Sequence, residues 1–312
     1  MSAMGELAHM VKRRPKDGVK ESHPDNKAGF VFMLPWLLGL LGITIVPMIA
    51  SFALAFTDYS LLAPPEFVGL DNIREMIGDT RLHNSLVVTF TYVLVGVPLQ
   101  LVVALLLAVA LNQGLSGLSF YRSVFYLPSL LGGSVAISIL WRQMFGANGL
   151  INQFLGMLGI ENAPGWVSNP STALSTIILL NVWTFGSPMI IFLAGLRQIP
   201  QMYYEAASVD GASKVAQFFR ITIPLLTPII FFNLVLQVIN AFQTFTQAFV
   251  VSGGTGGPSD STMFYTLYLY QKGFTQFDMG YASAMAWLLL IIVGVFTAIN
   301  FILSKFWVFY DD

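Results

Sequence analysis

The chain has 312 residues, of which 55% are apolar and only 10% are charged, and its mean hydropathy is +0.71. Soluble domains carry about a quarter charged residues, so this composition requires lipid around the protein. The net charge of −1 offers no basic field for a nucleic acid, and the absence of cysteine excludes disulfide frameworks, thiolate metal sites and cysteine nucleophiles.

The polar N-terminal segment, residues 1–28, is predicted to be a cytoplasmic tail. Six Lys and Arg residues lie between Lys12 and Lys27, in a composition typical of a disordered chain or of one lying on a lipid surface. The apolar run that follows is longer than the hydrophobic region of a signal peptide and has no clear small-residue cleavage pattern. We therefore expect this run to be retained as the first membrane span.

Six apolar stretches are predicted to cross the membrane as helices, because each approaches or exceeds the roughly 20 residues that span a ~30 Å hydrocarbon core. Their central portions contain no Asp, Glu, Lys or Arg. The predicted fold is all-α, with one membrane domain over residues 29–312. The expected spans are 29–57, 84–111, 120–144, 171–195, 225–251 and 279–304.

The distribution of basic residues predicts the orientation, because loops rich in Lys and Arg stay in the cytoplasm. Eleven of the 15 Lys and Arg residues lie in the tail, the second and fourth connections and the C-terminal end, and four lie in the other three connections. Both termini are therefore predicted to be cytoplasmic.

Two of the predicted external connections are long enough to contain short helices. In the first, Asp71 could cap a helix that runs through Met76. In the third, the apolar segment 150–158 predicts another helix, and Trp166 is a candidate anchor at the membrane interface.

The cytoplasmic connection between spans four and five, residues 199–224, is predicted to form a helix–glycine–helix elbow. Pro200 suits the first turn of a helix over 202–210, and Gly211 suits the left-handed position that ends it. A second helix is expected from Ser213 to about residue 221, before Pro224 opens the fifth span.

The fifth span carries a polar stripe. Its residues recur at intervals of four, three, four and three, so they share one face of a helix, and such a face must contact protein or water rather than lipid. One interpretation is hydrogen bonding between helices; the other is a path for a neutral, polyhydroxylated solute. The residues are Asn233, Gln237, Asn240, Thr244 and Gln247, with Gln243 one turn away.

No catalytic or metal-binding constellation is recognised in the sequence. The glycine-rich segment 252–258 lacks the Lys and Ser/Thr of a phosphate-binding loop, and the three histidines are scattered. Proton- and sodium-driven carriers usually keep charged residues at membrane depth, which these spans do not have. We therefore expect energy to come from a separate subunit, with no catalytic residue and no metal in this chain.

The elbow sequence closely resembles a known family motif. Glu205-Ala206-Ala207, three residues, Gly211, nine residues and then Ile221-Thr222-Ile223-Pro224 match the signature loop of the permease subunits of ABC importers, with Ile223 where the pattern has Leu. Further segments resemble the carbohydrate class of these permeases, typified by maltose and glycerol-phosphate transporters. They are 67–72, 121–128, 181–183, 193–196 and 252–258.

The resemblance implies how this chain would work. The elbow would be the coupling helix that docks on a cytoplasmic ATPase, through Glu205, Ala206, Ala207, Asp210, Gly211 and Pro224. Solute contacts would fall on the polar stripe and in mid span four, near Thr184, Phe185 and Ser187. The partners would be a second homologous permease subunit, two ATP-binding subunits that use ATP and Mg²⁺, and an extracytoplasmic binding protein for a sugar or polyol. This chain would bind no cofactor, and it would lie in the cell membrane of a bacterium or archaeon.

Two alternatives remain at this point. One is an ion-coupled or facilitative carrier that acts alone. The other is a membrane-embedded enzyme such as a lipid-linked glycosyl transferase, for which the acidic first connection is the only candidate site. Neither the precise solute nor its contacts follow from the sequence.

Overall fold

The computed structural model describes residues 26–113, 117–160 and 162–309. Most of the predicted tail, residues 1–28, lies outside the described residues. The chain divides into two compact units, Met1–Ala50 and Ser51–Asp312, which are described separately. The first unit contains helix α1 (Asn26–Gly39), the π-helical turn η1 (Leu40–Ile45) and the start of α2 (Val46–Leu54), which together form the candidate span Gly29–Leu54.

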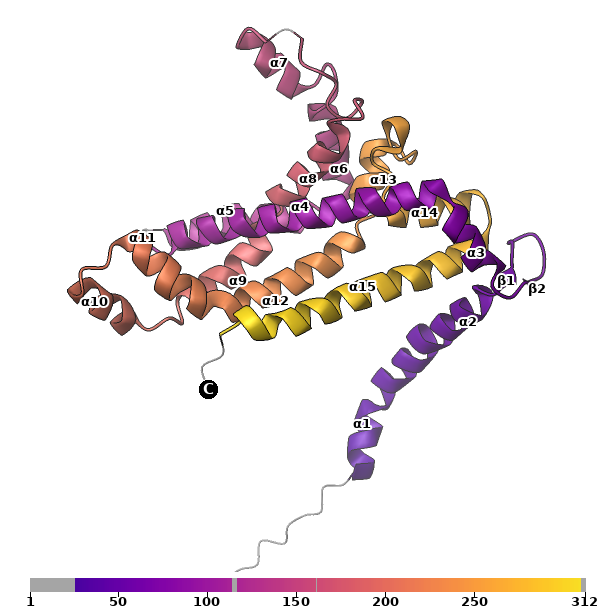
Figure 1. Ribbon diagram of the computed structural model, residues 1–312, viewed down its shortest axis with the longest axis horizontal. Helices are drawn as coiled ribbons and strands as arrows, with labels where there is room; N and C mark the ends of the chain where they lie inside the picture. The colour runs from indigo at the N-terminus through magenta and orange to yellow at the C-terminus, as the bar shows by residue number, and fades with distance from the viewer. Residues whose placement is uncertain (1–25, 114–116, 161, 310–312) are drawn as a thin grey trace, which may run out of the picture. The chain divides into compact units, whose positions relative to one another are not determined.

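In the second unit, three long helices run alongside one another (Figure 1): α4 (Thr80–Leu111), α12 (Ile223–Phe242) and α15 (Met279–Trp307). The short helix α11 (Lys214–Gln217) and the π-helical turn η2 (Phe218–Thr222) lead directly into α12. Helices α4 and α15, and the continuous helical run Lys214–Phe242, are each apolar and long enough to cross a membrane. A largely helical membrane fold is thereby confirmed.

The remaining membrane segments are broken helices. The predicted third span is α5 (Leu118–Leu131) and α6 (Val135–Met144), bent by 94°, and the fourth is α8 (Ala173–Trp183) and α9 (Gly186–Leu196), bent by 41°. Among the described residues, four helices qualify as spans alone, or up to six if each bent pair is one span.

The fifth predicted span, 225–251, is also interrupted. Helix α12 ends at Phe242, and the separate helix α13 (Thr246–Ser252) follows after a non-helical segment. The expectation of a continuous helix through this region was wrong. The hydroxyl of Thr266 donates a hydrogen bond to the carbonyl oxygen of Thr244, which satisfies a backbone group that the break leaves open.

The two ends of the bundle differ. At one end, called the elbow end, lie α10 (Gln201–Val209), α11 and the last described residues, because the amide of Phe309 donates to the hydroxyl of Thr227 near the start of α12. The opposite end, called the loop end, is formed by short elements. They are β1 (Thr57–Asp58), β2 (Glu66–Phe67), α3 (Asp71–Gly78), the 3₁₀ turn η3 (Pro258–Asp260), α14 (Tyr265–Tyr270) and the π-helical turn η4 (Gln271–Thr275).

Two predicted loop helices are present. Helix α7 (Leu150–Met157) matches the expected 150–158 segment. Helix α3 also forms, but Leu70 occupies its cap position and Asp71 lies in its first turn, where it pairs with Arg74 at 2.9 Å. Strands β1 and β2 pair antiparallel, with Thr57 opposite Phe67, and Asn72 of α3 donates to the carbonyl oxygen of Thr57.

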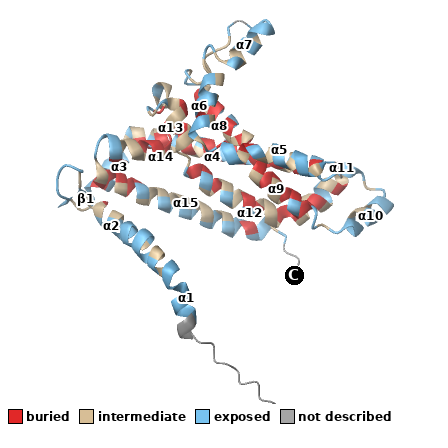
Figure 2. Ribbon diagram, turned by 180° about the vertical axis from the view of Figure 1, so that it is seen from behind, coloured by how far each residue is buried: buried red, intermediate tan, exposed pale blue. Residues whose placement is uncertain are grey.

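The buried core lies where α4 packs against α8, α9, α12 and α14 (Figure 2). Ala104 and Ala108 on α4 are fully buried, and such small residues let membrane helices approach closely. Tyr92 and Phe264 are also buried and pack edge to face, with ring centroids 4.9 Å apart. This packing holds the breaks of the interrupted helices against a continuous helix, α4.

Candidate functional site

A polar cavity of about 310 Å³ lies where the three interrupted helices meet α4. Its volume is at the lower end of the ~300–1,000 Å³ range of small-molecule sites. Of the described residues that line it, none is charged. The lining residues are Tyr92, Ser129, Gly133, Asn181, Thr184, Gln237, Asn240, Ala241, Gln243, Thr244, Phe245, Thr246 and Gln247.

The cavity brings together most of the solute-path residues predicted from the sequence. Those that line it are Thr184, Gln237, Asn240, Gln243, Thr244 and Gln247. Phe185 and Ser187 do not line it, although they flank the break between α8 and α9. Asn233 is fully buried, its side-chain amide donates to the carbonyl oxygen of Ile229, and it too lies outside the lining.

The cavity offers free hydrogen-bonding capacity. Among the described residues, the side-chain amides of Gln237, Asn240 and Gln243 have no hydrogen bond to another protein group, and Asn240 and Gln243 are exposed. Each carboxamide both donates and accepts. Phe245 adds an aromatic ring to the same wall. The arrangement can therefore bind a neutral, hydroxyl-rich molecule in a setting that would penalise an uncompensated charge.

The elbow forms as a compact helical turn. Helix α10 ends at Val209, Gly211 has φ +78°, which favours glycine, and the hydroxyl of Ser213 accepts a hydrogen bond from the amide of Ala216. The side-chain amide of Gln217 donates to the hydroxyl of Ser208, which ties α11 to α10.

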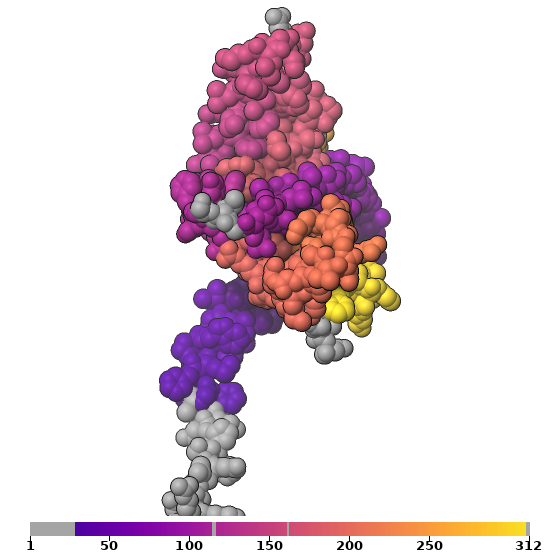
Figure 3. Space-filling view, turned by 90° about the vertical axis from the view of Figure 1, so that its left-hand side faces the viewer, coloured from indigo at the N-terminus to yellow at the C-terminus, as the bar shows by residue number. Residues whose placement is uncertain are grey.

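The predicted coupling residues gather on this elbow. Glu205, Ala206, Asp210 and Gly211 are exposed, whereas Ala207 and Pro224 are partly buried. Seen from the elbow end, the elbow residues form the orange surface next to the yellow C-terminal residues (Figure 3). The apolar side chains of Met202 and Val209 are also open to solvent, which makes this surface suitable for contact with another protein.

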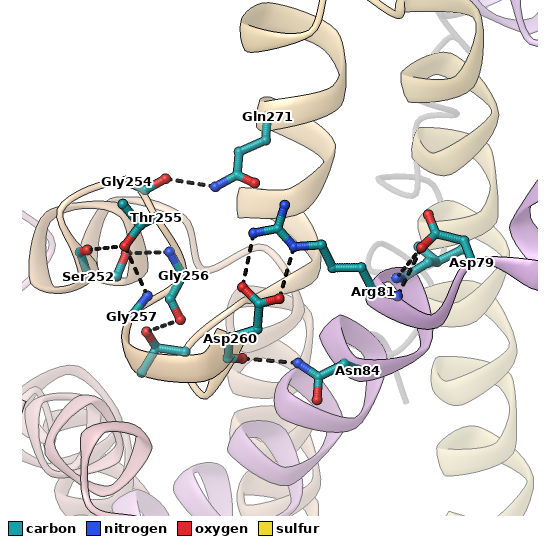
Figure 4. Close-up of polar contacts among 12 residues, drawn as sticks. Asp79, Arg81, Asn84, Ser252, Gly254, Thr255, Gly256, Gly257, Asp260 and Gln271 are labelled. Atoms are coloured by element: carbon teal, nitrogen blue, oxygen red, sulfur yellow. Dashed lines mark hydrogen bonds and ion pairs between the residues drawn. The ribbon is translucent and has the colours of Figure 1, made fainter. Parts of the chain in front are cut away.

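The loop end is held by charged contacts (Figure 4). The guanidinium of Arg81 donates to both carboxylate oxygens of Asp260, at 3.0 and 2.9 Å, and the side-chain amide of Asn84 donates to the carbonyl oxygen of Asp260. Asp260 follows the glycine-rich segment 252–258, and the amide of Gln271 donates to the carbonyl oxygen of Gly254. The segment is therefore fixed to both α4 and the η4 turn.

Asp79 is the centre of a second cluster at the loop end. Its carboxylate accepts hydrogen bonds from the hydroxyls of Tyr268 and Tyr281, at 2.6 and 2.7 Å, and from the amides of Arg81 and Leu82 at the start of α4. Burial acts to raise the pKa of Asp79, but these four donors together lower it below its ordinary value. Asp79 is therefore ionised at neutral pH.

Comparison with known proteins identifies the family. The model of the binding-protein-dependent transport system inner membrane component matches residues 80–307, which include the cavity and the elbow. The chain belongs to this family. The predicted resemblance to carbohydrate-class ABC importer permeases is confirmed, and the chain is a permease subunit, a transport component rather than an enzyme.

Relatives of known family match this chain over almost its whole length. A probable ABC transporter permease protein of Bacillus subtilis (strain 168), YesP, is 55% identical over 95% of this chain and 97% of its own. The lactose transport system permease protein LacF of Rhizobium radiobacter is 31% identical over 89% of this chain and 94% of its own. The crystal structure of a bacterial alginate ABC transporter, in complex with an alginate pentasaccharide-bound periplasmic protein, has a chain of the same fold. The two chains superpose with a TM-score of 0.74 and are 22% identical, and the match covers 90% of this chain and 94% of the other.

Several residues of the permease cavity were not predicted from the sequence. Tyr92 lies on α4, Ser129 on α5 and Thr246 on α13. Tyr92 and Ser129 lie in largely apolar segments, and Thr246 lies beside Gln247 but off the regular spacing that singled out the fifth span. A helix break could have pointed to Ser129, because the Gly132-Gly133-Ser134 sequence interrupts the third span within one turn after it.

Proposed function

We propose that this permease forms half of the translocation pathway of an ATP-driven importer for a sugar or related polyol. It would lie in the cell membrane of a bacterium or archaeon as a membrane domain over residues 29–312 with six spans, a cytoplasmic tail over 1–28 and both termini in the cytoplasm. The excess of Lys and Arg in the tail and elbow supports this orientation. The position of Phe309 beside the elbow end supports a C-terminus on the same side as the elbow.

The observation that carries the proposal is the neutral cavity at the three helix breaks. Carboxamides such as those of Asn240 and Gln243 can exchange hydrogen bonds with sugar hydroxyls without a charge to desolvate. Phe245 could stack on the apolar face of a sugar ring. The names of relatives that carry lactose, or trehalose and maltose, favour the same class of solute. A carrier that works alone is not favoured, because the described residues that line the cavity include no charged group for a coupling ion.

The transport cycle would be alternating access, driven from the elbow. Two partner ATPase subunits, which use ATP and Mg²⁺, would bind the elbow through Glu205, Ala206, Ala207, Asp210 and Gly211, and would move α12 through Pro224. A second homologous permease subunit would complete the cavity, and an extracytoplasmic binding protein would deliver the solute. This chain would bind no cofactor of its own.

The solute path can be tested by replacing Asn240 and Gln243 together with leucine. We expect uptake of labelled lactose or maltose by the reconstituted complex to fall by about tenfold or more, because two sugar hydrogen bonds are lost, while ATP hydrolysis is kept. Asn300→Leu is the matched control, since within the described part of the chain the Asn300 amide bonds only to its own helix, at the carbonyl oxygen of Phe296. Unchanged uptake in the double variant would remove the proposed path.

Coupling can be tested at Gly211. We expect Gly211→Ala to reduce uptake and solute-stimulated ATP hydrolysis together, because an alanine at φ +78° strains the elbow by about 1–2 kcal/mol. Gly211→Asn should lose less of both activities than Gly211→Ala, since asparagine tolerates a positive φ better than alanine does. Equal activity of all three proteins, with equal amounts in the membrane, would contradict a coupling role for the elbow.

A further inference from the structure

The break between α8 and α9 leaves backbone groups without helical partners at membrane depth. Helix α8 ends at Trp183 and α9 begins at Gly186, so the carbonyl oxygen of Thr184 and the amide of Ser187 lie at the interruption. Each unsatisfied backbone group in a membrane costs several kcal/mol, and other groups must bond to it. The partners that do so come from two other segments, α4 and α5.

Ser129 of α5 bridges both sides of this break. Its hydroxyl donates to the carbonyl oxygen of Thr184 at 2.7 Å and accepts from the amide of Ser187 at 2.8 Å. One side chain therefore holds the end of α8 and the start of α9 in a fixed relation. Gly132, one turn further along, allows this approach, because a Cβ there would lie 2.1 Å from Cγ2 of Thr184.

Gln100 of α4 also bonds to this break. It is only 2% exposed, and its side-chain amide donates to the carbonyl oxygen of Thr184 at 3.1 Å and to the Thr184 hydroxyl at 3.0 Å. Its own carbonyl oxygen accepts a longer bond of 3.5 Å from the amide of Asn181. A buried, fully bonded polar group of this kind rigidifies its surroundings.

These bonds change the role expected for Thr184. Its hydroxyl donates to the carbonyl oxygen of Asn181 at 2.7 Å and accepts from Gln100, so its hydrogen is already used. Asn181, by contrast, lines the cavity with a side-chain oxygen that has no hydrogen bond among the described residues. The bonds at the break thus determine how Asn181 is presented to the cavity.

We propose that Gln100 and Ser129 are positioning residues that set which sugars the cavity accepts, by fixing the α8–α9 break and thereby the direction of Asn181. Gln100 does not line the cavity and acts entirely through Thr184 and Asn181. The inference rests on the proposed function of the cavity. It assigns selectivity to residues on α4 and α5 in addition to those of the polar stripe on α12.

The test compares Ser129→Ala, Ser129→Thr and Gln100→Met with the unchanged chain in the reconstituted complex, using labelled lactose and maltose. Because the binding protein is the same throughout, a change in the ratio of the two uptake rates arises in the permease. We expect Ser129→Ala and Gln100→Met to change this ratio by about threefold to tenfold, the effect of one lost hydrogen bond, and Ser129→Thr to keep it. The matched control is Ser123→Ala on the same helix, because the Ser123 hydroxyl bonds to the carbonyl oxygen of Ser119 and to no other described residue.

A second measurement does not depend on the sugar. The chain has no cysteine, and a Cβ at Gly133, which lines the cavity, would meet nothing within 4 Å. Gly133→Cys therefore reports access to the cavity through its rate of labelling by a water-soluble maleimide. We expect Ser129→Ala to change this rate and Ser123→Ala to leave it unchanged.

Three results would overturn the inference. Equal loss of both sugars in Ser129→Ala and Gln100→Met would indicate a structural role alone. Failure of Ser129→Thr to restore the ratio would assign the effect to packing rather than to hydrogen bonds. Normal uptake with unchanged labelling in Ser129→Ala would exclude a role in shaping the cavity. Import of neither sugar by the unchanged complex would count against the proposed function, whereas the maleimide labelling, which needs no sugar, would still test whether Ser129 shapes the cavity.

Discussion

The loop end and the cavity are both built around polar contacts but use different chemistry. At the loop end, Asp79 and Asp260 are carboxylates that each bind several donors, and Lys272 lies 3.5 Å from Glu75. In the cavity, the contacts are between carboxamides, hydroxyls and backbone groups. Charged groups lie where water can reach part of each ion, and neutral groups lie where burying a charged group would be costly.

The two regions also differ in whether they leave hydrogen-bonding groups unpaired. The carboxylate of Asp79 accepts four hydrogen bonds, so the cluster is closed and serves to fix the start of α4. At the cavity, Ser129 in the lining and Gln100 behind it are fully hydrogen-bonded, while Gln237 and Gln243 remain free among the described residues. The loop end is thus built for rigidity, and the cavity combines a rigid frame with groups that can bind a solute.

The largest effect is expected at Asp79. Asp79→Ala removes the cap of α4 and leaves the hydroxyls of Tyr268 and Tyr281 without their acceptor, which should destabilise the protein by about 2–4 kcal/mol. Thermal unfolding of the purified permease in detergent measures this. The control is Asp71→Ala, whose carboxylate is 63% exposed and pairs only with Arg74. Similar losses in both variants would contradict the central role of the Asp79 cluster.

A smaller effect is expected at the frame of the cavity, where two adjacent glycines give a matched pair. A Cβ at Gly132 would lie 2.1 Å from Cγ2 of Thr184, whereas one at Gly133 would meet nothing within 4 Å. Gly132→Ala should therefore cost about 1–3 kcal/mol by overpacking, and Gly133→Ala should change stability by less than about 0.5 kcal/mol. Equal stabilities, measured by the same thermal unfolding, would show that the α5–α8 contact is looser than the structure indicates.

Much of the cavity could be predicted from the sequence because helical periodicity fixes which side chains share a face. Gln237 and Asn240 on α12 were found in this way. The same periodicity failed at Asn233, which is buried outside the cavity lining. It also assumed a helix that stops at Phe242, although Thr244 and Gln247 beyond that point still line the cavity. A stripe of polar residues gives the face of a helix but not the depth at which that face meets the cavity.

The frame of the cavity could not be predicted, for a different reason. The bonds from Gln100 and Ser129 to Thr184 join residues 84 and 55 positions apart in the chain. No local pattern marks either partner, because a single Gln or Ser in an apolar helix can equally bond to its own backbone, as Ser123 does. The elbow was predicted correctly because its helix, glycine and cap are all local signals.

The smallest effect is expected for the ion pair between Arg81 and Asp260. Their side chains are 38% and 34% exposed, so solvent weakens the attraction, but the contact is bidentate and joins α4 to the glycine-rich segment. A double-mutant cycle with Arg81→Ala and Asp260→Ala should give a coupling of about 0.5–1 kcal/mol that falls as salt is added. The exposed pair of Arg74 and Asp71, measured in the same way, should give about 0.3 kcal/mol. A coupling at the loop end no larger than this control would mean that the ion pair does not hold the glycine-rich segment, which would then be held by the hydrogen bonds from Asn84 and Gln271.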